Sequence, residues 1–260
     1  MPSAHDSAVN VRRRFAGGRA AGAVPTVLVL LAVVAVLYLV RDAAYRATTA
    51  GAVALPSVFG GFFEVVGELG IVVLALVFAC AAWRARSRGL EHVTVALVGA
   101  TATVAAYVLS EVVKGVVREA RPCRAMAVHT VAACPAANDW SWPSNHAVIA
   151  AGLATAVVAL SPLWWRLVVP LALAVGVSRV LVGAHYWHDV VAGMSLGVLV
   201  VWFGTWALAP AAHRLLERSV DVGPARWRSL LGEDGRQGSP PRSSTQVTTP
   251  PPPTDRQSGR

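Results

Sequence analysis

Six apolar runs recur along the first 210 residues, most of them close to the length that a helix needs to cross a lipid bilayer, about 20 residues. They cover residues 24–40, 65–83, 93–113, 147–160, 163–182 and 190–209. Hydrophobic residues make up 55% of the chain and charged residues only 14%. A soluble protein would have too little polar sequence here to cover six buried helices. The sequence therefore predicts an all-α, six-span transmembrane helical bundle.

The first run also has features of a cleaved signal peptide. Arg12, Arg13 and Arg14 precede it, and small residues follow it. Its apolar core is longer than that of most signal peptides, so we favour an uncleaved signal anchor.

The basic residues indicate the orientation of the bundle. Of the 23 Lys and Arg residues, 16 fall in segments on the same side of the membrane as the N-terminus, and the other seven fall on the opposite side. Cytoplasmic loops carry the excess of positive charge, so we expect both termini in the cytoplasm of a multi-pass plasma-membrane protein. This topology accounts for the net charge of +9, and no basic patch with interleaved aromatic residues indicates a nucleic-acid partner.

The chain divides into three parts. Residues 1–23 form a cytoplasmic N-terminal segment, residues 24–210 the transmembrane domain, and residues 211–260 a cytoplasmic tail. From about Gly232 onward Gly, Ser, Thr, Pro and Arg dominate. Such a composition cannot bury enough apolar surface to fold, so we expect a largely disordered tail.

Three polar segments, here called the signature segments, lie at the borders of the apolar runs, on the predicted extracytoplasmic side. The first runs from Lys114 to Arg121-Pro122, the second is Pro143-Ser144-Asn145-His146, and the third is Ser178-Arg179 followed by His185 and Asp189. Together they supply three fixed cations, two imidazoles, a hydroxyl and a carboxylate. This set can bind a phosphate and break its ester bond.

The spacing of these segments resembles the signature of the type-2 phosphatidic acid phosphatase superfamily, the integral-membrane lipid phosphatases related to vanadium haloperoxidases. The family pattern is Lys, six residues, Arg-Pro; then Pro-Ser-Gly-His; then Ser-Arg, five residues, His, three residues, Asp. This chain departs from it only at Asn145, where the family most often has Gly. The resemblance covers residues 114–189. It implies a metal-independent phosphatase that forms a phosphohistidine intermediate and needs no cofactor.

The first signature segment is predicted to continue the third apolar helix. Lys114, Arg118 and Arg121 are spaced at i, i+4 and i+7, which places them on one helical face, and Pro122 ends the helix. Arg121 can bind phosphoryl oxygens through two parallel hydrogen bonds, with Lys114 as a point charge. We interpret Arg118, which is outside the family pattern, as part of a basic collar at the membrane border.

The second signature segment opens the fourth apolar run. Ser144 is a candidate N-cap, and the free N–H groups of a first helical turn bind anions. Asn145 and His146 lie in that turn. Ser144 and Asn145 are therefore candidate phosphate-binding residues, and the resemblance implies that His146 is the general acid and base.

The third signature segment contains the candidate nucleophile. Asp189 follows His185 by four residues, so in a helix its carboxylate can accept the Nδ1–H of His185 and leave Nε2 free to attack phosphorus. His188 has only an alanine four residues on, and we interpret it as an interfacial residue. Arg179 can add a third cation to the phosphate site.

The predicted outer loop between the first two signature segments contains Cys123 and Cys134, which would face an oxidising compartment. The sequence leaves open whether they form a disulfide or remain two free thiols. Cys80 lies within the second apolar run.

The predicted substrate is a lipid phosphate or diphosphate in the outer leaflet. The abundance of Ala, Val, Arg and Gly is typical of a GC-rich bacterium, which favours a polyprenyl diphosphate of cell-envelope synthesis such as undecaprenyl diphosphate. Phosphatidic acid, phosphatidylglycerol phosphate and a phosphorylated prenyl sugar remain alternatives. Two alternatives belong to other functional classes. One is a vanadate-dependent haloperoxidase, whose known members are soluble, and the other is an inactive lipid-binding or transport protein. The sequence does not indicate the oligomeric state.

Overall fold

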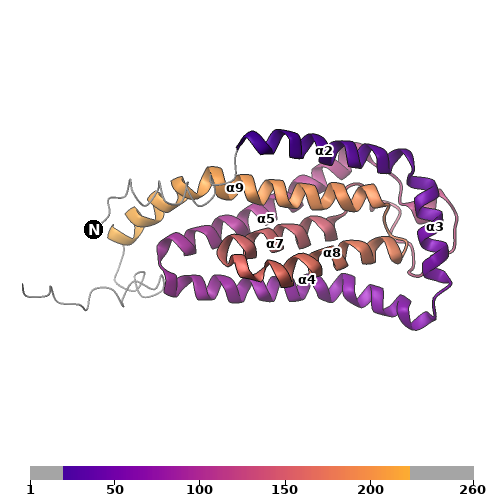
Figure 1. Cartoon of the computed structure of the whole chain (residues 1–260), viewed down its shortest axis with the longest axis horizontal. Coiled ribbons are helices and arrows are strands. Elements are labelled where there is room, and N and C mark those ends of the chain that lie inside the picture. Colours follow the sequence, from indigo (N-terminus) through magenta and orange to yellow (C-terminus); the bar gives the residue numbers. More distant parts are fainter. Residues whose placement is uncertain (1–19, 223–260) are drawn as a thin grey trace, which may run out of the picture.

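In a computed structural model that describes residues 20–222, the chain forms an elongated bundle of helices, and no strand occurs in this range (Figure 1). Residues 1–19 and 223–260, which include most of the predicted tail, lie outside the described residues. The α-helices are α2 (Ala20–Leu39), α3 (Arg41–Val53), α4 (Ser57–Ala85), α5 (Leu90–Val117), α6 (Pro122–Ala125), α7 (Asn145–Leu160), α8 (Trp165–Leu181) and α9 (Trp187–Val222). Two short 3₁₀ helices, η1 (Arg86–Arg88) and η2 (Pro162–Trp164), connect helices at one end.

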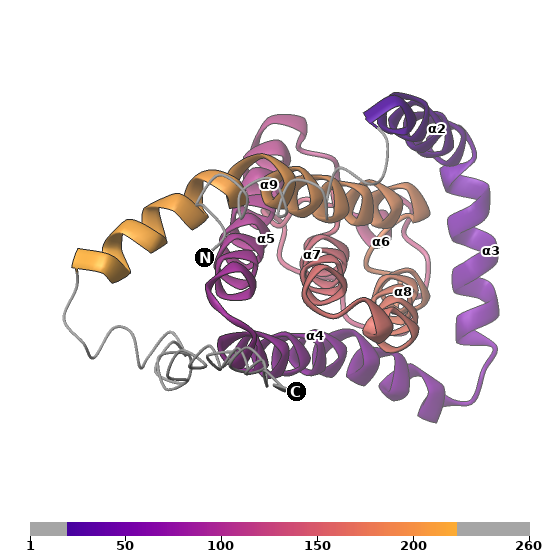
Figure 2. The same ribbon diagram turned by 60° about the vertical axis from the view of Figure 1, so that its left-hand side comes forward.

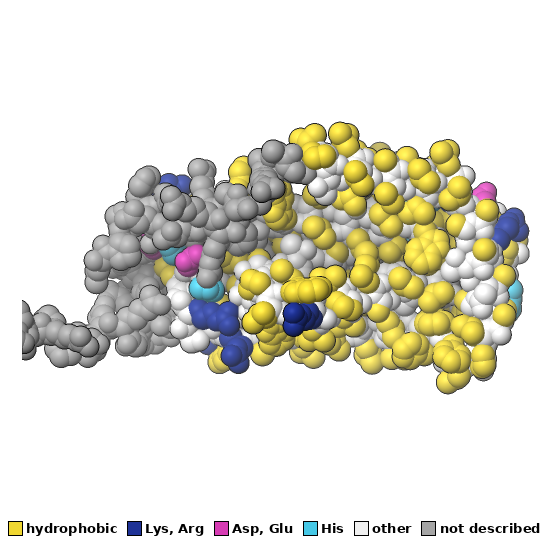
Figure 3. All heavy atoms as spheres, in the orientation of Figure 1, with side chains coloured by type: hydrophobic (Ala, Val, Ile, Leu, Met, Phe, Trp, Pro, Cys, Tyr) yellow, Lys and Arg dark blue, Asp and Glu magenta, His cyan; other side chains and the backbone are white. Residues whose placement is uncertain are grey.

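The described helices identify a multi-pass membrane protein. Four helical stretches are long and apolar enough to cross a membrane: Ser57–Arg88, Leu90–Ala125, Pro162–Leu181 and Trp187–Ser219. The bent pair α2 and α3 raises the number to five if it is one span. Hydrophobic side chains cover most of the described face of the bundle, and charged side chains gather mainly toward its ends (Figure 3). Such a surface suits a hydrocarbon environment.

Helix α7 is the shortest of the helices that run along the bundle, and it is the central one. It has 16 residues and packs against α4, α5, α8 and α9, which surround it in Figure 2. A helix enclosed by other helices does not contact lipid along its length, so it need not match the full thickness of the bilayer. This explains the short fourth apolar run of the sequence.

Two glycines let α7 and α9 pack with their backbones in close contact. A Cβ atom added to Gly193 would collide with the carbonyl oxygen of Ser144, and one added to Gly197 would collide with that of Val148. Small residues four positions apart are a common basis of close helix pairs in membranes. This contact sets the first turns of α7 and α9 side by side, and both turns carry signature residues.

Helix α3 lies across the end of the bundle at which α5 and α8 finish (Figures 1 and 2). It bends by 73° from α2. The Tyr45 hydroxyl donates a hydrogen bond to the carbonyl oxygen of Gly183 at 2.9 Å, and Trp187 Nε1 donates one to Thr48 Oγ1 at 3.0 Å. Helix α3 therefore holds the segment that connects α8 to α9 and contains His185. No apolar run of the sequence predicted α3, because its residues are more polar than those of a membrane span.

The prediction that Lys114, Arg118 and Arg121 lie on one face of a continuous helix is wrong. Helix α5 ends at Val117, and Arg118 takes a left-handed conformation with φ 51°. Arg121 is extended, as expected for a residue before proline, and Pro122 begins α6 instead of ending α5. The turn sends Arg118 into solvent and lets Arg121 reach back into the protein, where its side chain is buried.

The structure joins Cys123 and Cys134 in a disulfide that closes a loop with a sequence separation of 11. We expect both thiols to resist alkylation until a reductant is added, and the Cys123→Ser, Cys134→Ser double variant to lose about 2–3 kcal/mol of stability through loop entropy. Mass spectrometry of the alkylated protein, with and without reductant, measures the bond. Cys80, which is exposed and free, provides an internal control for alkylation. Complete alkylation of all three cysteines without reductant would contradict the bond.

Candidate active site at the end of the bundle

The three signature segments meet at the end of the bundle that α3 crosses. From the first segment, Lys114 lies in the last turn of α5 and Arg121 at the start of α6. The second segment, Ser144, Asn145 and His146, lies at the start of α7. From the third, Arg179 lies in the last turn of α8, His185 in the α8–α9 connection and Asp189 in the first turn of α9. The connection turns at Gly183, whose φ of +85° is favourable only for a residue without a Cβ atom. Helix ends that lie far apart in the sequence thus supply one polar cluster.

The contacts of His185 determine where its proton lies. Nδ1 is 3.2 Å from Asp189 Oδ2, a carboxylate acceptor, so Nδ1 carries the hydrogen. Nε2 is 3.1 Å from an Arg121 amino group, which can only donate, so Nε2 presents its lone pair. This is the neutral tautomer that a nucleophilic imidazole requires. The predicted pairing of His185 with Asp189 is present, although His185 itself precedes α9.

Burial keeps His185 uncharged. Loss of hydration lowers its pKa to about 4; Asp189 opposes this shift, while the positive charges of Arg121 and Lys114 add to it. The imidazole is neutral above its pKa, so it keeps a free lone pair well below neutral pH.

We therefore expect phosphorylation of His185 by an aryl phosphate ester to persist at pH 5. At a pKa of about 4 the imidazole is about 90% neutral there, whereas a histidine with the ordinary pKa of about 6.5 would be about 3% neutral. The measurement is the initial rate of covalent labelling between pH 4 and 7.5, corrected for the titration of the substrate phosphate. A loss of labelling centred near pH 6.5 would contradict the burial argument.

Lys114 and Arg121 share one carboxylate. Asp139, in the loop before α7, lies 2.8 Å from an Arg121 amino group and 3.5 Å from Lys114 Nζ. Partial burial raises the pKa of Asp139, but the hydrogen bonds and charges of Arg121 and Lys114 outweigh this and lower it overall. Both cations are buried, and both bind an oxyanion in this structure. Their geometry therefore suits an oxyanion, such as a phosphoryl group.

Arg179 and His146 also share a carboxylate. Glu68, on α4, lies 3.2 Å from an Arg179 amino group and 3.0 Å from His146 Nε2. The Glu68 side chain is exposed, so an incoming anion can displace it. One oxygen acceptor can therefore contact the third cation and the second histidine together.

The start of α7 supplies polar groups beside these cations. Ser144 occupies the predicted N-cap position, and its buried Oγ has no hydrogen-bond partner among the described residues. Its backbone N–H donates to the Asp189 carbonyl at 3.1 Å and links α7 to α9. Asn145 accepts a hydrogen bond from Ser110 Oγ at 2.7 Å and donates one to Glu111 at 2.6 Å. In this structure the Asn145 side chain therefore braces α7 against α5.

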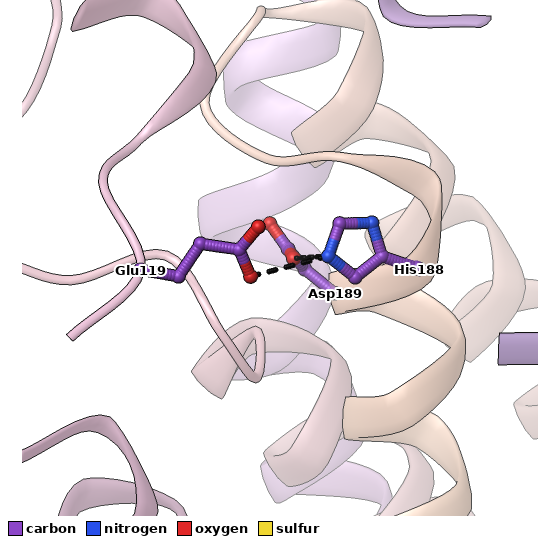
Figure 4. A group of neighbouring side chains, drawn as sticks. All are labelled: Glu119, His188 and Asp189. Carbon is purple, nitrogen blue, oxygen red and sulfur yellow. Dashed lines mark hydrogen bonds and ion pairs between the residues drawn. The ribbon is translucent and has the colours of Figure 1, made fainter. Parts of the chain in front are cut away.

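The interpretation of His188 as interfacial is wrong. Its side chain is 1% exposed, and Nε2 lies 3.2 Å from Glu119 Oε2 and 3.1 Å from Asp189 Oδ1 (Figure 4). Helical spacing predicted no orienting partner, because Ala192 lies four residues on, but His188 contacts the neighbouring Asp189 and Glu119 on another segment. Glu119, His188 and Asp189 place three metal-ligand atoms within 4.8 Å of one another.

Several polar residues of the site were missed by the sequence analysis. Glu68 carried a usable signal, because an ionisable residue within an apolar span is often functional. Asp139, Glu111, Glu119 and Ser141 carried none, since they occupy positions outside the family pattern and contact the signature residues only through the fold. Ser141 matters because its hydroxyl donates to Asp189 Oδ2 at 2.5 Å.

Comparisons with known proteins agree with this architecture. The sequence model of the PAP2 superfamily matches residues 93–212. A protein of Sulfolobus acidocaldarius named undecaprenyl-diphosphatase is 41% identical over 95 residues, which cover 36% of this chain and 46% of that protein, so the match spans about half of that relative. Undecaprenyl-diphosphatase BcrC of Bacillus subtilis is 30% identical over 145 residues, which cover 55% of this chain and 72% of BcrC.

A solved structure shares the fold. It is the crystal structure of a transmembrane PAP2-type phosphatidylglycerolphosphate phosphatase from Bacillus subtilis, with a TM-score of 0.51 and 21% identity. The match covers 70% of this chain and 92% of that one.

Proposed function

Because this chain belongs to the PAP2 superfamily, we propose that it hydrolyses a lipid phosphate or diphosphate at the end of the bundle where the signature segments meet. The observation that carries the proposal is the pair of contacts at the ring nitrogens of His185, from which its tautomer follows. The imidazole has its lone pair on Nε2, its hydrogen on Nδ1 toward Asp189, and a buried arginine beside the lone pair. An anion bound by that arginine would place phosphorus next to the nucleophile.

In the first chemical step, Nε2 of His185 attacks phosphorus and forms a P–N bond while the P–O bond to the leaving group breaks. His146 gives its proton to the departing oxygen. The Nδ1–H bond to Asp189 stabilises the positive charge that develops on the His185 ring. Lys114, Arg121 and Arg179 bind the equatorial oxygens, on which negative charge is spread in the transition state. Ser144 and the N–H groups of the first turn of α7 add donors.

In the second step, water attacks phosphorus and breaks the P–N bond. His146, now neutral, takes a proton from this water, and phosphate leaves with His185 restored. The side-chain cations supply the charge compensation in both steps, so we expect activity without an added metal ion or cofactor.

Two relatives support a polyprenyl diphosphate as the substrate, since both carry the name undecaprenyl-diphosphatase. With a diphosphate, His185 would attack the terminal phosphorus and the lipid monophosphate would leave. The shared fold of a phosphatidylglycerolphosphate phosphatase supports a phospholipid substrate as the second candidate, and phosphatidic acid belongs to the same class. The signature residues contact phosphate in either case, so the lipid is selected elsewhere.

Phosphate release from the purified protein in detergent tests the function. The panel consists of undecaprenyl diphosphate, phosphatidylglycerol phosphate and phosphatidic acid, each in the presence of a chelator. We expect the highest kcat/KM for the diphosphate. Preference for a phospholipid would overturn the substrate assignment, and no release from any of the three would favour an inactive lipid-binding or transport protein.

We also propose that the bundle has six spans, with the active site on the extracytoplasmic side. Helices α2, α4, α5, α7, α8 and α9 run along the long axis, and α3 lies across one end (Figure 1). Arg84, Arg86, Arg88 and Arg166 lie at the opposite end from the signature segments, in or beside the connections α4–α5 and α7–α8. Over the whole sequence, 16 of the 23 Lys and Arg residues fall in segments predicted for this side, and an excess of Lys and Arg marks the cytoplasmic side.

Topology reporters should show this orientation. A reporter fused after Val222 is expected to give a cytoplasmic signal, because α9 leads away from the active-site end. The same reporter fused after Leu55, between α3 and α4, is expected to give an extracytoplasmic signal. The reverse pair of signals would place the active site in the cytoplasm.

A further inference from the structure

His188 lies behind the nucleophile, on the far side of Asp189. Oδ2 of Asp189 receives hydrogen bonds from Ser141 Oγ at 2.5 Å and from the Tyr186 N–H at 2.9 Å, and it lies 3.2 Å from His185 Nδ1. Oδ1 points the other way, toward Nε2 of His188 at 3.1 Å. The carboxylate is fully buried, so its orientation depends entirely on protein groups.

His188 is itself held in place. Nε2 lies within hydrogen-bond distance of Glu119 Oε2 at 3.2 Å, and because its two neighbours are carboxylates, Nε2 carries the hydrogen. The ring stacks on Tyr186 with centroids 5.3 Å apart and meets the edge of Tyr38 at 5.2 Å. Figure 4 shows the ring edge pointing between the two carboxylates.

Glu119 is also linked to Asp189 through Ser141. Its carbonyl oxygen accepts a hydrogen bond from the Ser141 N–H at 2.8 Å, and the hydroxyl of Ser141 donates to Asp189. Glu119 follows the left-handed turn at Arg118, which directs it back toward the bundle. Glu119 thus contacts a neighbour of each Asp189 oxygen: Ser141, which donates to Oδ2, and His188, which faces Oδ1.

We propose that His188, held by Glu119, is a positioning residue that orients Asp189 and thereby the imidazole of His185. Oδ1 of Asp189 is buried and makes no hydrogen bond among the described residues, so its contact there is with Nε2 of His188, 3.1 Å away. Without His188 that oxygen would lose this contact. A buried carboxylate in that state rotates or takes up a proton, and either change weakens its bond to His185 Nδ1. The inference rests on the proposed function, in which His185 attacks phosphorus.

Two substitutions at this position separate positioning from packing. His188→Phe keeps a ring between Tyr186 and Tyr38 but has no donor. His188→Gln has an amide N–H that can reach the same carboxylates. For His188→Phe we expect the rate of phosphoenzyme formation and kcat to fall roughly 10–100-fold, the range for loss of a partner that orients a functional group. KM should change less than about threefold, because His188 does not contact substrate. His188→Gln should recover most of the loss.

His213 offers a matched control at the opposite end of α9. It is also buried, with Nε2 3.1 Å from Glu217 and Nδ1 3.2 Å from Thr94 Oγ1. His213→Phe removes an equivalent buried contact, and we expect kcat and KM to stay near the parent values. Thermal unfolding of each variant in detergent identifies any loss of folded protein, and rates are taken per folded molecule.

The outcomes decide between distinct possibilities. No phosphate release by the parent from any lipid phosphate would refute the proposed function. An active parent with an equally active His188→Phe variant would refute only the positioning role. Equal losses in His188→Phe, His188→Gln and His213→Phe would mean a structural effect. Loss of parent activity in EDTA, with recovery in Zn²⁺ that Glu119→Gln abolishes, would show that this group binds a metal and would overturn the inference.

Discussion

Replacing His185 with alanine is expected to abolish phosphate release and all covalent labelling. The variant lacks the only imidazole whose lone pair lies beside a buried arginine among the described residues, so no phosphoenzyme can form. Rapid-quench labelling with a ³²P-labelled substrate measures the acid-labile phosphate that phosphohistidine releases. His129→Ala is a suitable control, because His129 is exposed on the loop before α7 and should leave labelling unchanged. Acid-labile phosphate on the His185→Ala variant would refute the assignment.

Replacing His146 with alanine is expected to slow turnover by roughly 10²–10⁴-fold, the usual contribution of a general acid and base. The effect should depend on the leaving group. A nitrophenyl phosphate needs no proton on its departing oxygen, so the variant should still phosphorylate His185. Hydrolysis of the intermediate should then be slow, since no base activates the water.

The measurement for this variant is a burst of nitrophenolate followed by slow decay of the labelled protein. Parallel assays with a lipid phosphate, whose leaving group does need a proton, should show slow formation of the intermediate. Equal losses in formation rate with both substrates would show that His146 has a role other than proton transfer, such as binding phosphate alongside Arg179.

Local sequence patterns were sufficient to predict the helices along the bundle and to identify most of the residues that the structure brings together in the candidate site. Apolar runs predicted the helices of the bundle because burial in lipid needs a minimum length of apolar sequence. They failed for α3, which covers the active-site end through Tyr45 and Thr48 and is not apolar enough to resemble a span. The four-residue spacing of His185 and Asp189 predicted their contact because residues so close in the sequence stay within reach of each other, although His185 lies just before α9.

The same reasoning failed where the chain reverses. Spacing placed Lys114 and Arg121 on one helical face, but the left-handed turn at Arg118 ends α5 first, and the two cations meet through Asp139 instead. His188 was judged by its neighbour four residues ahead, although its partners are Asp189 and Glu119.

The sequence by itself determined that this chain is a multi-pass helical membrane protein of the PAP2 superfamily and which residues are candidates for the chemistry. Both follow from features within short stretches, namely apolar length and motif spacing. Only the tertiary structure decided the protonation state of those residues and the direction in which their side chains point. The close contact of α7 with α9 at Gly193 and Gly197, the placement of Glu68 on α4 against His146, and the burial that lowers the pKa of His185 all depend on helices packing across distances that no local pattern encodes.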